Sequence, residues 1–442
     1  MKKISIKILS IALFVLILGS SITSVASLYN VQNQKSPDTS AYNQDGMCRG
    51  TPKIEAILEM IDEDLLREYL ERLVEYGPRM TGTYGCEKSA EYIYSKFTEI
   101  GLEARYQNWT RFGNRNYPRI FKSQNIEGTL FGNNCPDDNI ILFNAHYDTV
   151  KRSPGADDNG GGVAAVLAAA YALSQFQFNH TIKFVSFSGE EVGFLGSYEY
   201  VKESYNNKDD ILVDLNADMI AYTGTGDAGS KFLIYGTQDV QWIMEIIEEL
   251  NFAYDIDFEL DQRILNEDAR HGGSDYFIFM KYGYEAISFF ESEWNPYLHT
   301  PNDTIEHINF SYLVNTTRLI VATIAFLADN EYTYPQIQIE SPQFGKLYYK
   351  GMKRCNIRDL NTIVIDDIWI WAEVKYAMNP IERVEFYYDE LLVFTDTEYP
   401  YKWHFNKLSI GKHRITVIAY DQYGRRTSSF KDILFINVFR NR

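Results

Sequence analysis

The chain has 442 residues, of which 45% are apolar and 23% are charged, and its formal net charge is −18. This composition is typical of a globular protein. The length exceeds what one hydrophobic core usually organises, so we expect two domains. Nucleic-acid binding depends on clustered Lys and Arg side chains, and the chain has no basic stripe, so we expect no nucleic-acid partner.

Residues 1–27 have the pattern of an export signal. Lysines near the start precede an apolar run from Ile8 to Gly19, and small residues follow at 24–26. This run is short for a bilayer span, so we expect cleavage and a secreted or cell-surface protein. Membrane attachment through an uncleaved segment is the minority alternative. The polar residues 28–53 are expected to form a linker or a pro-segment.

The cysteines of this chain are compatible with disulfides in an oxidising compartment. Four cysteines allow three pairings, and their spacing favours none of them. No pair has the CxxC spacing of a structural zinc site. The four residues are Cys48, Cys86, Cys135 and Cys355.

Residues 54–332 are predicted to form one domain in which helices and strands alternate. Apolar residues at helical spacing predict helices first, and short apolar runs then alternate with helical patterns. The predicted helices are 54–76, 87–100, 163–176, 240–250, 274–282 and 312–327, and the predicted strands are 140–145, 181–187, 211–217 and 285–290. This order favours an α/β three-layer fold with a mixed or mostly parallel β-sheet flanked by helices.

Residues 335–442 show strand patterns without helices. Turn residues separate the predicted strands, which are 362–374, 381–388, 391–395 and 414–420. Short strands at this spacing predict an all-β immunoglobulin-like sandwich. The aromatic residues Trp369, Trp371 and Trp403 fit packing within a sandwich, and a carbohydrate-binding face is the alternative. The partner of this domain stays open.

Histidine and acidic residues follow the predicted strands of the first domain. His146 comes after the first strand, Glu190 and Glu191 after the second, Asp218 after the third, and His299 in the loop after the fourth. Ligand sites of open α/β sheets form outside the carboxyl ends of the strands, so we expect these side chains to converge. Imidazoles and carboxylates together suit zinc and similar divalent ions.

Asp157, in the glycine-rich turn Gly155–Gly160, is the expected bridge between two metal ions. Two ions about 3.5–4 Å apart polarise a carbonyl group and activate water. The adjacent acids Glu190 and Glu191 suit a division of work between a ligand and a general base. Singly, His146 would fit a core histidine and Asp157 a helix cap, and only the combination favours a metal site.

Several motifs, in this order, resemble those of the M28 family of zinc aminopeptidases over roughly residues 55–330. A weaker similarity covers Arg79–Thr83. The five segments that carry the resemblance are Asn144–Thr149, Pro154–Asn159, Ser188–Gly193, Asn216–Met219 and Leu298–Pro301. The resemblance implies two Zn²⁺ ions, both bridged by one aspartate. The implied ligands are Asp157 as the bridge, His146 and Asp218 at one ion, and Glu191 and His299 at the other.

The same resemblance assigns roles beside the ligands. Glu190 would be the general base that activates a metal-bound water, and Asp148 would orient the imidazole of His146. A cis peptide bond would follow Asp157. Asp303 would either support His299 or form a turn.

The implied function is that of an exported aminopeptidase acting on peptides with a free N-terminus. Three alternatives stay open: a glutaminyl-cyclase-like relative, a carboxypeptidase-type relative, and a non-catalytic surface-binding protein. A carboxypeptidase needs a basic cluster for the terminal carboxylate, and the candidates Arg263, Arg270 and Lys281 are scattered along the chain. His271 is a candidate lining residue of the substrate pocket. The preferred residue at the cleaved position, the native metal and the oligomeric state stay open.

Overall fold

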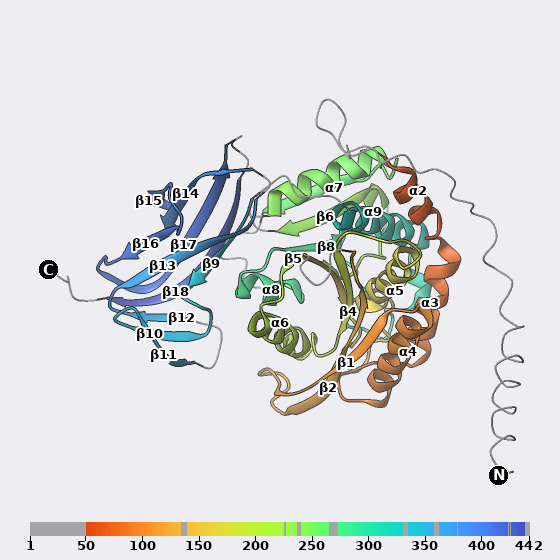
Figure 1. Ribbon diagram of the computed structural model, residues 1–442. Helices are drawn as coiled ribbons and strands as arrows, with labels where there is room; N and C mark the ends of the chain where they lie inside the picture. Colours follow the sequence, from red (N-terminus) through yellow and green to blue (C-terminus); the bar gives the residue numbers. More distant parts are fainter. Residues whose placement is uncertain are drawn as a thin grey trace, which may run out of the picture.

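The computed structural model describes residues 50–437, except for 134–138, 225–226, 237–239, 265–272, 330–334, 358–361, 378, 423 and 425. An α/β body and an all-β body lie side by side, with the all-β body at the left of Figure 1. The predicted export signal and most of the polar segment fall outside the described residues. So do Cys48, Cys135, Arg270 and His271.

An eight-stranded mixed sheet forms the centre of the α/β body (Figure 1). Its order is β1-β2-β4-β3-β5-β8-β6-β7, and the central pairs β4–β3, β3–β5 and β5–β8 are parallel. The edge pair β6–β7 is also parallel, whereas β1–β2, β2–β4 and β6–β8 are antiparallel. The predicted mixed, mostly parallel sheet is therefore confirmed. The strands are β1 (Glu103–Phe112), β2 (Ile120–Leu130), β3 (Ile140–His146), β4 (Thr181–Phe187), β5 (Ile211–Ala217), β6 (Lys231–Gly236), β7 (Glu259–Ile264) and β8 (Ala286–Glu291).

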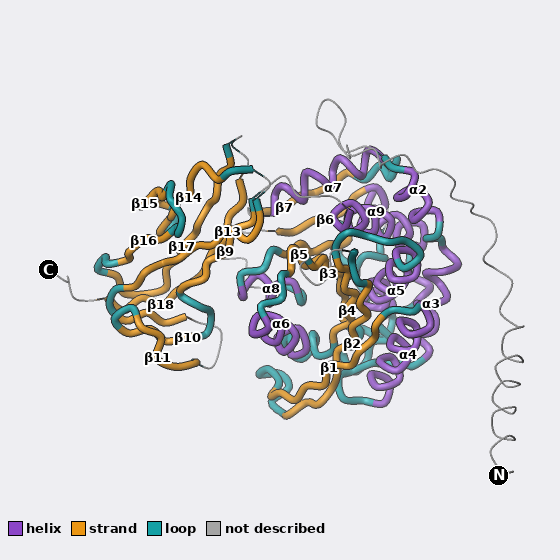
Figure 2. Tube along the Cα trace, viewed as in Figure 1, coloured by secondary structure: helices purple, strands orange, loops and turns teal. Residues whose placement is uncertain are grey.

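Helices cover both faces of this sheet, which gives the three predicted layers (Figure 2). Alternate residues of β3 show the two faces, because Ile141 and Phe143 pack into one apolar cluster and Leu142 into another. The first cluster includes α2, α3, α4, α5, α7 and α9, and the second includes α6 and α8. The helices are α2 (Pro52–Glu59), α3 (Glu63–Glu75), α4 (Tyr84–Ile100), α5 (Gly162–Leu173), α6 (Leu195–Asn207), α7 (Gln241–Ala253), α8 (Tyr276–Tyr282) and α9 (Phe310–Asp329).

The helix predicted over 54–76 is two helices in the structure. The first ends at Glu59, and Asp62 caps the second by accepting a hydrogen bond from the backbone N–H of Leu65 at 2.9 Å. An aspartate at an N-cap position satisfies an otherwise unpaired N–H group, so a new helix begins there. The strands β1, β2, β6 and β7 and the helix α6 have no counterpart in the sequence analysis. Tyrosines and charged residues dominate α6, so its apolar periodicity is weak.

Helix α9 is long and apolar enough to cross a membrane by length and composition. In this structure 83% of its most apolar window is buried within the protein. Leu319, Ile320 and Phe326 belong to the main apolar cluster of the α/β body. α9 is therefore a core helix of that body.

The all-β body consists of two sheets, as predicted for an immunoglobulin-like sandwich. One sheet has the order β11-β10-β12-β18-β17-β14-β15 and the other β16-β13-β9. The alternating residues Ile415, Val417 and Ala419 are fully buried between them. The strands are β9 (Gln336–Ser341), β10 (Lys346–Tyr349), β11 (Met352–Asn356), β12 (Thr362–Ile365), β13 (Ile368–Tyr376), β14 (Ile381–Tyr388), β15 (Leu391–Asp396), β16 (Lys402–Phe405), β17 (Ser409–Asp421) and β18 (Arg426–Asn437).

The single strand predicted over 362–374 is two strands, β12 and β13, in different sheets. Asp366 lies between them with a φ of 78°, a left-handed conformation that ends the first strand. Of the aromatic residues noted in this region, Trp403 is buried in the core, whereas Trp369 and Trp371 are exposed. Packing in the sandwich therefore explains Trp403 alone.

The two bodies are in contact through aromatic side chains and a backbone hydrogen bond. Phe344, in the loop after β9, packs against Tyr282 of α8 at 4.4 Å between ring centroids. Its backbone N–H donates to the hydroxyl of Tyr205 on α6 at 3.0 Å. In the all-β body, the buried ammonium of Lys431 donates to the carbonyl oxygens of Ile339 and Pro342 at 2.6 and 3.1 Å.

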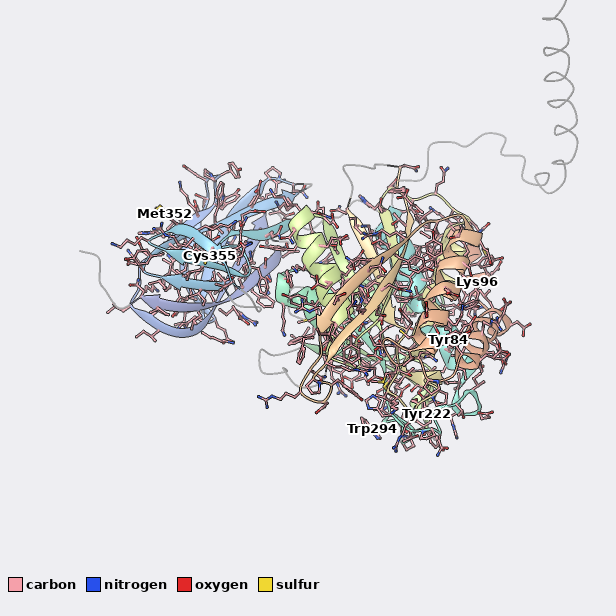
Figure 3. The ribbon with its side chains drawn as sticks, turned by 90° about the horizontal axis from the view of Figure 1, so that it is seen from below. Tyr84, Lys96, Tyr222, Trp294, Met352 and Cys355 are labelled. Atoms are coloured by element: carbon pink, nitrogen blue, oxygen red, sulfur yellow. The ribbon has the colours of Figure 1, made fainter. Side chains whose placement is uncertain are left out.

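The two described cysteines form no disulfide. Cys86 is buried in the α/β body, and its sulfur lies 3.6 Å from the hydroxyl of Ser188. Cys355 is exposed on the all-β body, where Figure 3 labels it. A disulfide between Cys86 and Cys355 is therefore excluded.

Candidate metal centre

The carboxyl ends of the central strands bring the expected side chains together. His146 is the last residue of β3, and Asp218 directly follows β5. Glu190 and Glu191 lie in the loop after β4, and His299 lies in the loop between β8 and α9. Parallel strands end at the same edge of a sheet, so residues far apart in sequence meet there.

Two groups of possible ligand atoms lie at this edge, and they share one aspartate, Asp158. In the first group, Nε2 of His146 lies 3.3 Å from Oδ1 of Asp158 and 3.5 Å from Oδ1 of Asp218. In the second group, Nε2 of His299 lies 3.1 Å from Oδ2 of Asp158 and 3.2 Å from Oε2 of Glu191. Each carboxylate oxygen of Asp158 therefore faces a different group.

The bridging position belongs to Asp158, and the assignment of Asp157 as the bridge is wrong in this structure. The carboxylate of Asp157 points away from the histidines, because Oδ1 accepts from the N–H of Ala221 at 3.2 Å and Oδ2 from the amide of Asn295 at 2.8 Å. The expected cis peptide bond is displaced by the same one residue and joins Asp158 to Asn159. Two adjacent aspartates in a turn look alike in a sequence, so the spacing did not distinguish them.

The pKa directions of the two aspartates agree with this correction. Burial and the carboxylate of Asp303 raise the pKa of Asp157 to about 7. Burial also acts to raise the pKa of Asp158, but its contacts with the imidazoles of His146 and His299 outweigh burial and lower it. Asp158 is therefore the aspartate that stays ionised between the two groups.

The buried carboxylate oxygens that face the histidines suit cations. Oδ2 of Asp158 lies 3.1 Å from Nε2 of His299, Oδ1 of Asp218 lies 3.5 Å from Nε2 of His146, and both oxygens are buried. Two ligand atoms on one tetrahedral zinc ion, with bonds of about 2.0–2.2 Å, lie about 3.3–3.6 Å apart. The nitrogen–oxygen separations of 3.1–3.5 Å are close to this value. The residues present therefore fit two divalent cations, with one on each side of Asp158.

The pKa directions of the two histidines also indicate that the cluster suits cations. Burial opposes a charge on His146, but the carboxylates of Asp218 and Glu190 outweigh it and raise the pKa of the imidazole well above its usual value. Hydrogen bonds with Asp158 and Glu191 raise the pKa of His299 to about 10. Buried carboxylates therefore draw positive charge onto both imidazoles, and divalent cations would supply that charge instead.

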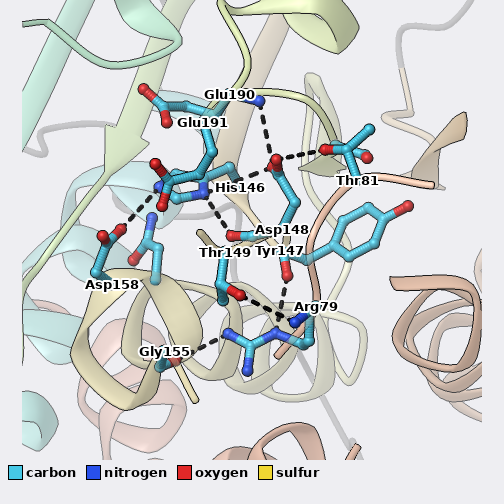
Figure 4. A network of polar contacts seen from close by, with 12 residues as sticks. Arg79, Thr81, His146, Tyr147, Asp148, Thr149, Gly155, Asp158, Glu190 and Glu191 are labelled. Carbon is cyan, nitrogen blue, oxygen red and sulfur yellow. Dashed lines mark hydrogen bonds and ion pairs between the residues drawn. The ribbon is translucent and has the colours of Figure 1, made fainter. Parts of the chain in front are cut away.

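Asp148 supports the cluster through two different groups (Figure 4). Its backbone carbonyl oxygen lies 3.0 Å from Nδ1 of His146, whereas its carboxylate lies 3.8 Å from that nitrogen. The carboxylate instead accepts from the hydroxyl of Thr81 at 2.6 Å and from the N–H of Glu190 at 3.2 Å. The predicted orientation of His146 thus involves the backbone of Asp148, and its side chain holds the loop that carries Glu190.

Glu190 lies beside Glu191 at the upper side of the cluster (Figure 4). Burial raises the pKa of Glu190 well above its usual value, and the carboxylates of Glu191 and Asp218 add to this effect against the opposing effect of His146. A carboxyl group with a raised pKa takes up a proton more readily than an exposed one. Glu190 can therefore accept and release a proton next to both groups of ligands.

Arg79 holds the end of β3 and the turn that carries Asp158 together. This fully buried guanidinium donates from Nε to the carbonyl of Tyr147 at 2.8 Å, and from its two Nη atoms to the carbonyls of Pro154 and Gly155 at 2.6 and 2.8 Å (Figure 4). Gly155 has a φ of 67°, which a side chain would disfavour. Within the weaker similarity over Arg79–Thr83, Arg79 is therefore a residue that supports the turn and not one of the expected ligands.

Asn295 and Asp303 support the same turn, and only Asp303 was noted from the sequence pattern. Asp303 was expected either to support His299 or to form a turn. In the structure its carboxylate accepts from the backbone N–H groups of Asp157 and Asp158 at 2.9 and 3.2 Å. Asn295 lies in no motif that the sequence analysis recognised. Its hydrogen-bond partner, Asp157, is 138 positions away in the sequence, so no local pattern indicates this contact.

Two segments of the chain match known families. Residues 125–324 match the family described as Peptidase family M28, and residues 360–417 match the one described as Bacterial Ig domain. Aminopeptidase YwaD of Bacillus subtilis (strain 168) is 33% identical over 208 residues, which cover 46% of this chain and 44% of that protein. A probable leucine aminopeptidase of Trichophyton verrucosum is 25% identical over 282 residues, which cover 60% of this chain and 71% of that protein.

Solved structures show the same fold for the α/β body. BSAP, a zinc aminopeptidase from Bacillus subtilis, has a TM-score of 0.52 at 20% identity, with 61% of this chain and 96% of that chain covered. The LapA aminopeptidase of Legionella pneumophila has a TM-score of 0.55 at 21% identity, with 69% of this chain and 80% of that chain covered. The predicted M28-type fold and the C-terminal immunoglobulin-like domain are both confirmed.

Proposed function

We propose that this chain, whose residues 125–324 form a peptidase family M28 domain, is an exported aminopeptidase that uses two divalent cations, with zinc as the expected metal. One observation carries the proposal: Asp158 presents one carboxylate oxygen to each of two groups of ligands. Relatives named aminopeptidases support the reaction class. The predicted N-terminal signal supports export.

The ligand assignment follows from the two groups. His146, Asp158 and Asp218 would hold one cation, and Asp158, Glu191 and His299 the other. When bound, a pair of such cations polarises the scissile carbonyl and lowers the pKa of water. The protein's part is to fix the positions of the ligands before substrate binds.

Glu190 is the proposed general base. It would take a proton from the attacking water and later give it to the amino group that leaves. Its buried position next to three carboxylates raises its pKa, which suits a group that must hold the proton between these two steps. Asp148 would keep Glu190 in place through its hydrogen bond to the Glu190 backbone.

The substrates are proposed to be peptides with a free N-terminus. The test is release of nitroaniline from aminoacyl-nitroanilides by the purified protein, with the same compounds N-acetylated as a control. Metal content is measured on the same sample by mass spectrometry. We expect two zinc ions per chain, activity on the free amines, and loss of activity with chelator.

The role of Glu190 is tested by Glu190→Gln, which removes the proton-accepting group but keeps the shape. We expect kcat to fall by about 10²–10⁴-fold with the metal content unchanged. Glu248→Gln, on the exposed face of α7, is the matched control and should leave kcat unchanged. Unchanged turnover in Glu190→Gln would reject the proposed base.

The same assays separate the alternatives. Release of a C-terminal residue from a peptide would indicate a carboxypeptidase-type enzyme, and cyclisation of an N-terminal glutaminyl peptide a glutaminyl-cyclase-like enzyme. A protein that binds no metal and cleaves no substrate would be a non-catalytic binding protein.

A further inference from the structure

We propose that Asn295 is a positioning residue that holds His299 in place for its cation, by tying the loop between β8 and α9 to the turn that carries Asp158. This inference rests on the proposed function, because it concerns one of the two cation sites. It gives Asp157 the role of anchor for this loop.

The two histidines of the cluster differ in how they are held. The imidazole of His146 is buried, and its Nδ1 lies in hydrogen-bond contact with the carbonyl oxygen of Asp148. The side chain of His299 is 51% exposed, and no hydrogen bond to its Nδ1 is present among the described residues. Metal-binding histidines usually need such a bond to fix the ring. His299 must therefore be fixed by its backbone.

The backbone at His299 is itself unusual. Its φ is 60°, a left-handed conformation that a residue with a side chain adopts only when its surroundings impose it. The loop therefore has to be held on both sides of His299.

Asn295 holds the loop before His299. Its side-chain amide nitrogen donates to Oδ2 of Asp157 at 2.8 Å. Its side-chain oxygen, Oδ1, accepts from the backbone N–H of Tyr297 at 2.8 Å. Asn295 is 1% exposed, whereas the preceding Trp294 is 76% exposed and lies at the surface of the molecule (Figure 3). The chain thus turns inward at Asn295, and one side chain both shapes the turn and joins it to Asp157.

Asp303 holds the loop after His299. Its carboxylate accepts from the N–H groups of Asp157 and Asp158, and its backbone carbonyl accepts from the N–H of Ala156 at 3.2 Å. His299 is four residues from each of these two ties. The loop that carries His299 is therefore joined on both sides of His299 to the turn that carries Asp158.

The structure thus makes a selective prediction. Loss of the Asn295 tie should release His299 and leave His146 and Asp218 where they are, because Asn295 has no hydrogen bond to either of them. Loss of a residue that orients a metal ligand typically lowers metal affinity by about 10–100-fold. We expect that loss at one cation only.

The experiment uses the full-length protein after removal of metal and titrates it with Zn²⁺ by calorimetry in the presence of a competing chelator. Asn295→Leu keeps the volume and removes both hydrogen bonds, Asn295→Ala is the smaller variant, and His299→Ala defines which cation is concerned. Asn251→Leu is the matched control. Asn251 is a buried asparagine with two hydrogen bonds to the backbone of Phe258, away from the cluster.

His299→Ala should abolish binding of one cation. We expect Asn295→Leu to lower the affinity for that same cation by tenfold or more and to change the affinity for the other cation by less than twofold. Asn251→Leu should bind both cations as the wild type does. Hydrogen exchange of residues 292–304, measured by mass spectrometry, should rise in Asn295→Leu and report the released loop even if stability falls.

Two results would overturn the inference. Wild-type affinities in Asn295→Leu would show that His299 is fixed without this tie, and equal weakening of both cations would show a general effect on the cluster. In either case the proposed function stands, provided that the wild type binds two cations and is active. A wild type that binds no cation refutes the proposed function itself.

Discussion

The substitution Arg79→Lys removes a planar donor and keeps the positive charge. In the wild type, three nitrogen atoms of the guanidinium serve three backbone carbonyls, those of Tyr147, Pro154 and Gly155. A lysine ammonium has one nitrogen atom and a different shape, so it cannot reach carbonyls on both sides of the turn. At least one buried carbonyl group would lose its donor.

The magnitude follows from the number of groups left unpaired. A buried polar group without a partner costs about 1–3 kcal/mol, so one or two such carbonyls predict a loss of about 2–4 kcal/mol. Burial lowers the pKa of Arg79 only to about 10, so the wild-type guanidinium is charged at neutral pH. The predicted loss comes from the carbonyl groups that lose a donor.

The assay is urea unfolding of the metal-free protein, combined with hydrogen exchange of residues 146–162. Arg72→Lys is the matched control, because the side chain of Arg72 is 52% exposed and its partner, the carboxylate of Glu75, is 62% exposed. We expect a change below about 1 kcal/mol for that exposed site. A loss below 1 kcal/mol in Arg79→Lys, with unchanged exchange at 146–162, would refute the reasoning.

Three further predictions concern the bridge, the sandwich and the contact between the two bodies. Asp158→Asn should abolish binding of both cations, whereas Asp157→Asn should weaken at most the cation held by His299; mass spectrometry of the metal content decides between the two aspartates. Burial lowers the pKa of Lys431 from 10.5 to about 8, so between these values the unfolded chain holds a proton that the folded protein lacks. Urea unfolding should therefore show wild-type stability rising with pH across this window by about 3 kcal/mol relative to Lys431→Met, and parallel pH profiles would contradict this. Phe344→Ala should cost about 1–2 kcal/mol of apolar contact and separate the unfolding transitions of the two bodies in calorimetry, and an unchanged thermogram would show that this contact does not couple them.

Much of the fold was predictable because its signals are local. The strands β4 and β5 lie at the predicted residues, since each is a short apolar run between polar segments. The hairpin of β1 and β2 escaped prediction, because polar and half-exposed residues dominate β1 and its pairing depends on β2 and β4. Burial in the sheet gives these residues their conformation, and a short window of sequence does not contain that information.

The order of residue types along the chain places histidine and acidic side chains at the predicted strand ends, and this order predicts that His146, Glu191, Asp218 and His299 meet. That outcome needs only the order of the strands and the rule that parallel strands end at one edge. The choice between Asp157 and Asp158 depends instead on contacts across the folded protein. Both lie in one irregular turn, and the side chain that faces the histidines is selected by hydrogen bonds to groups 64 and 138 positions away. Neighbouring residues of a turn point in different directions, and contacts from distant parts of the chain set which direction each one takes.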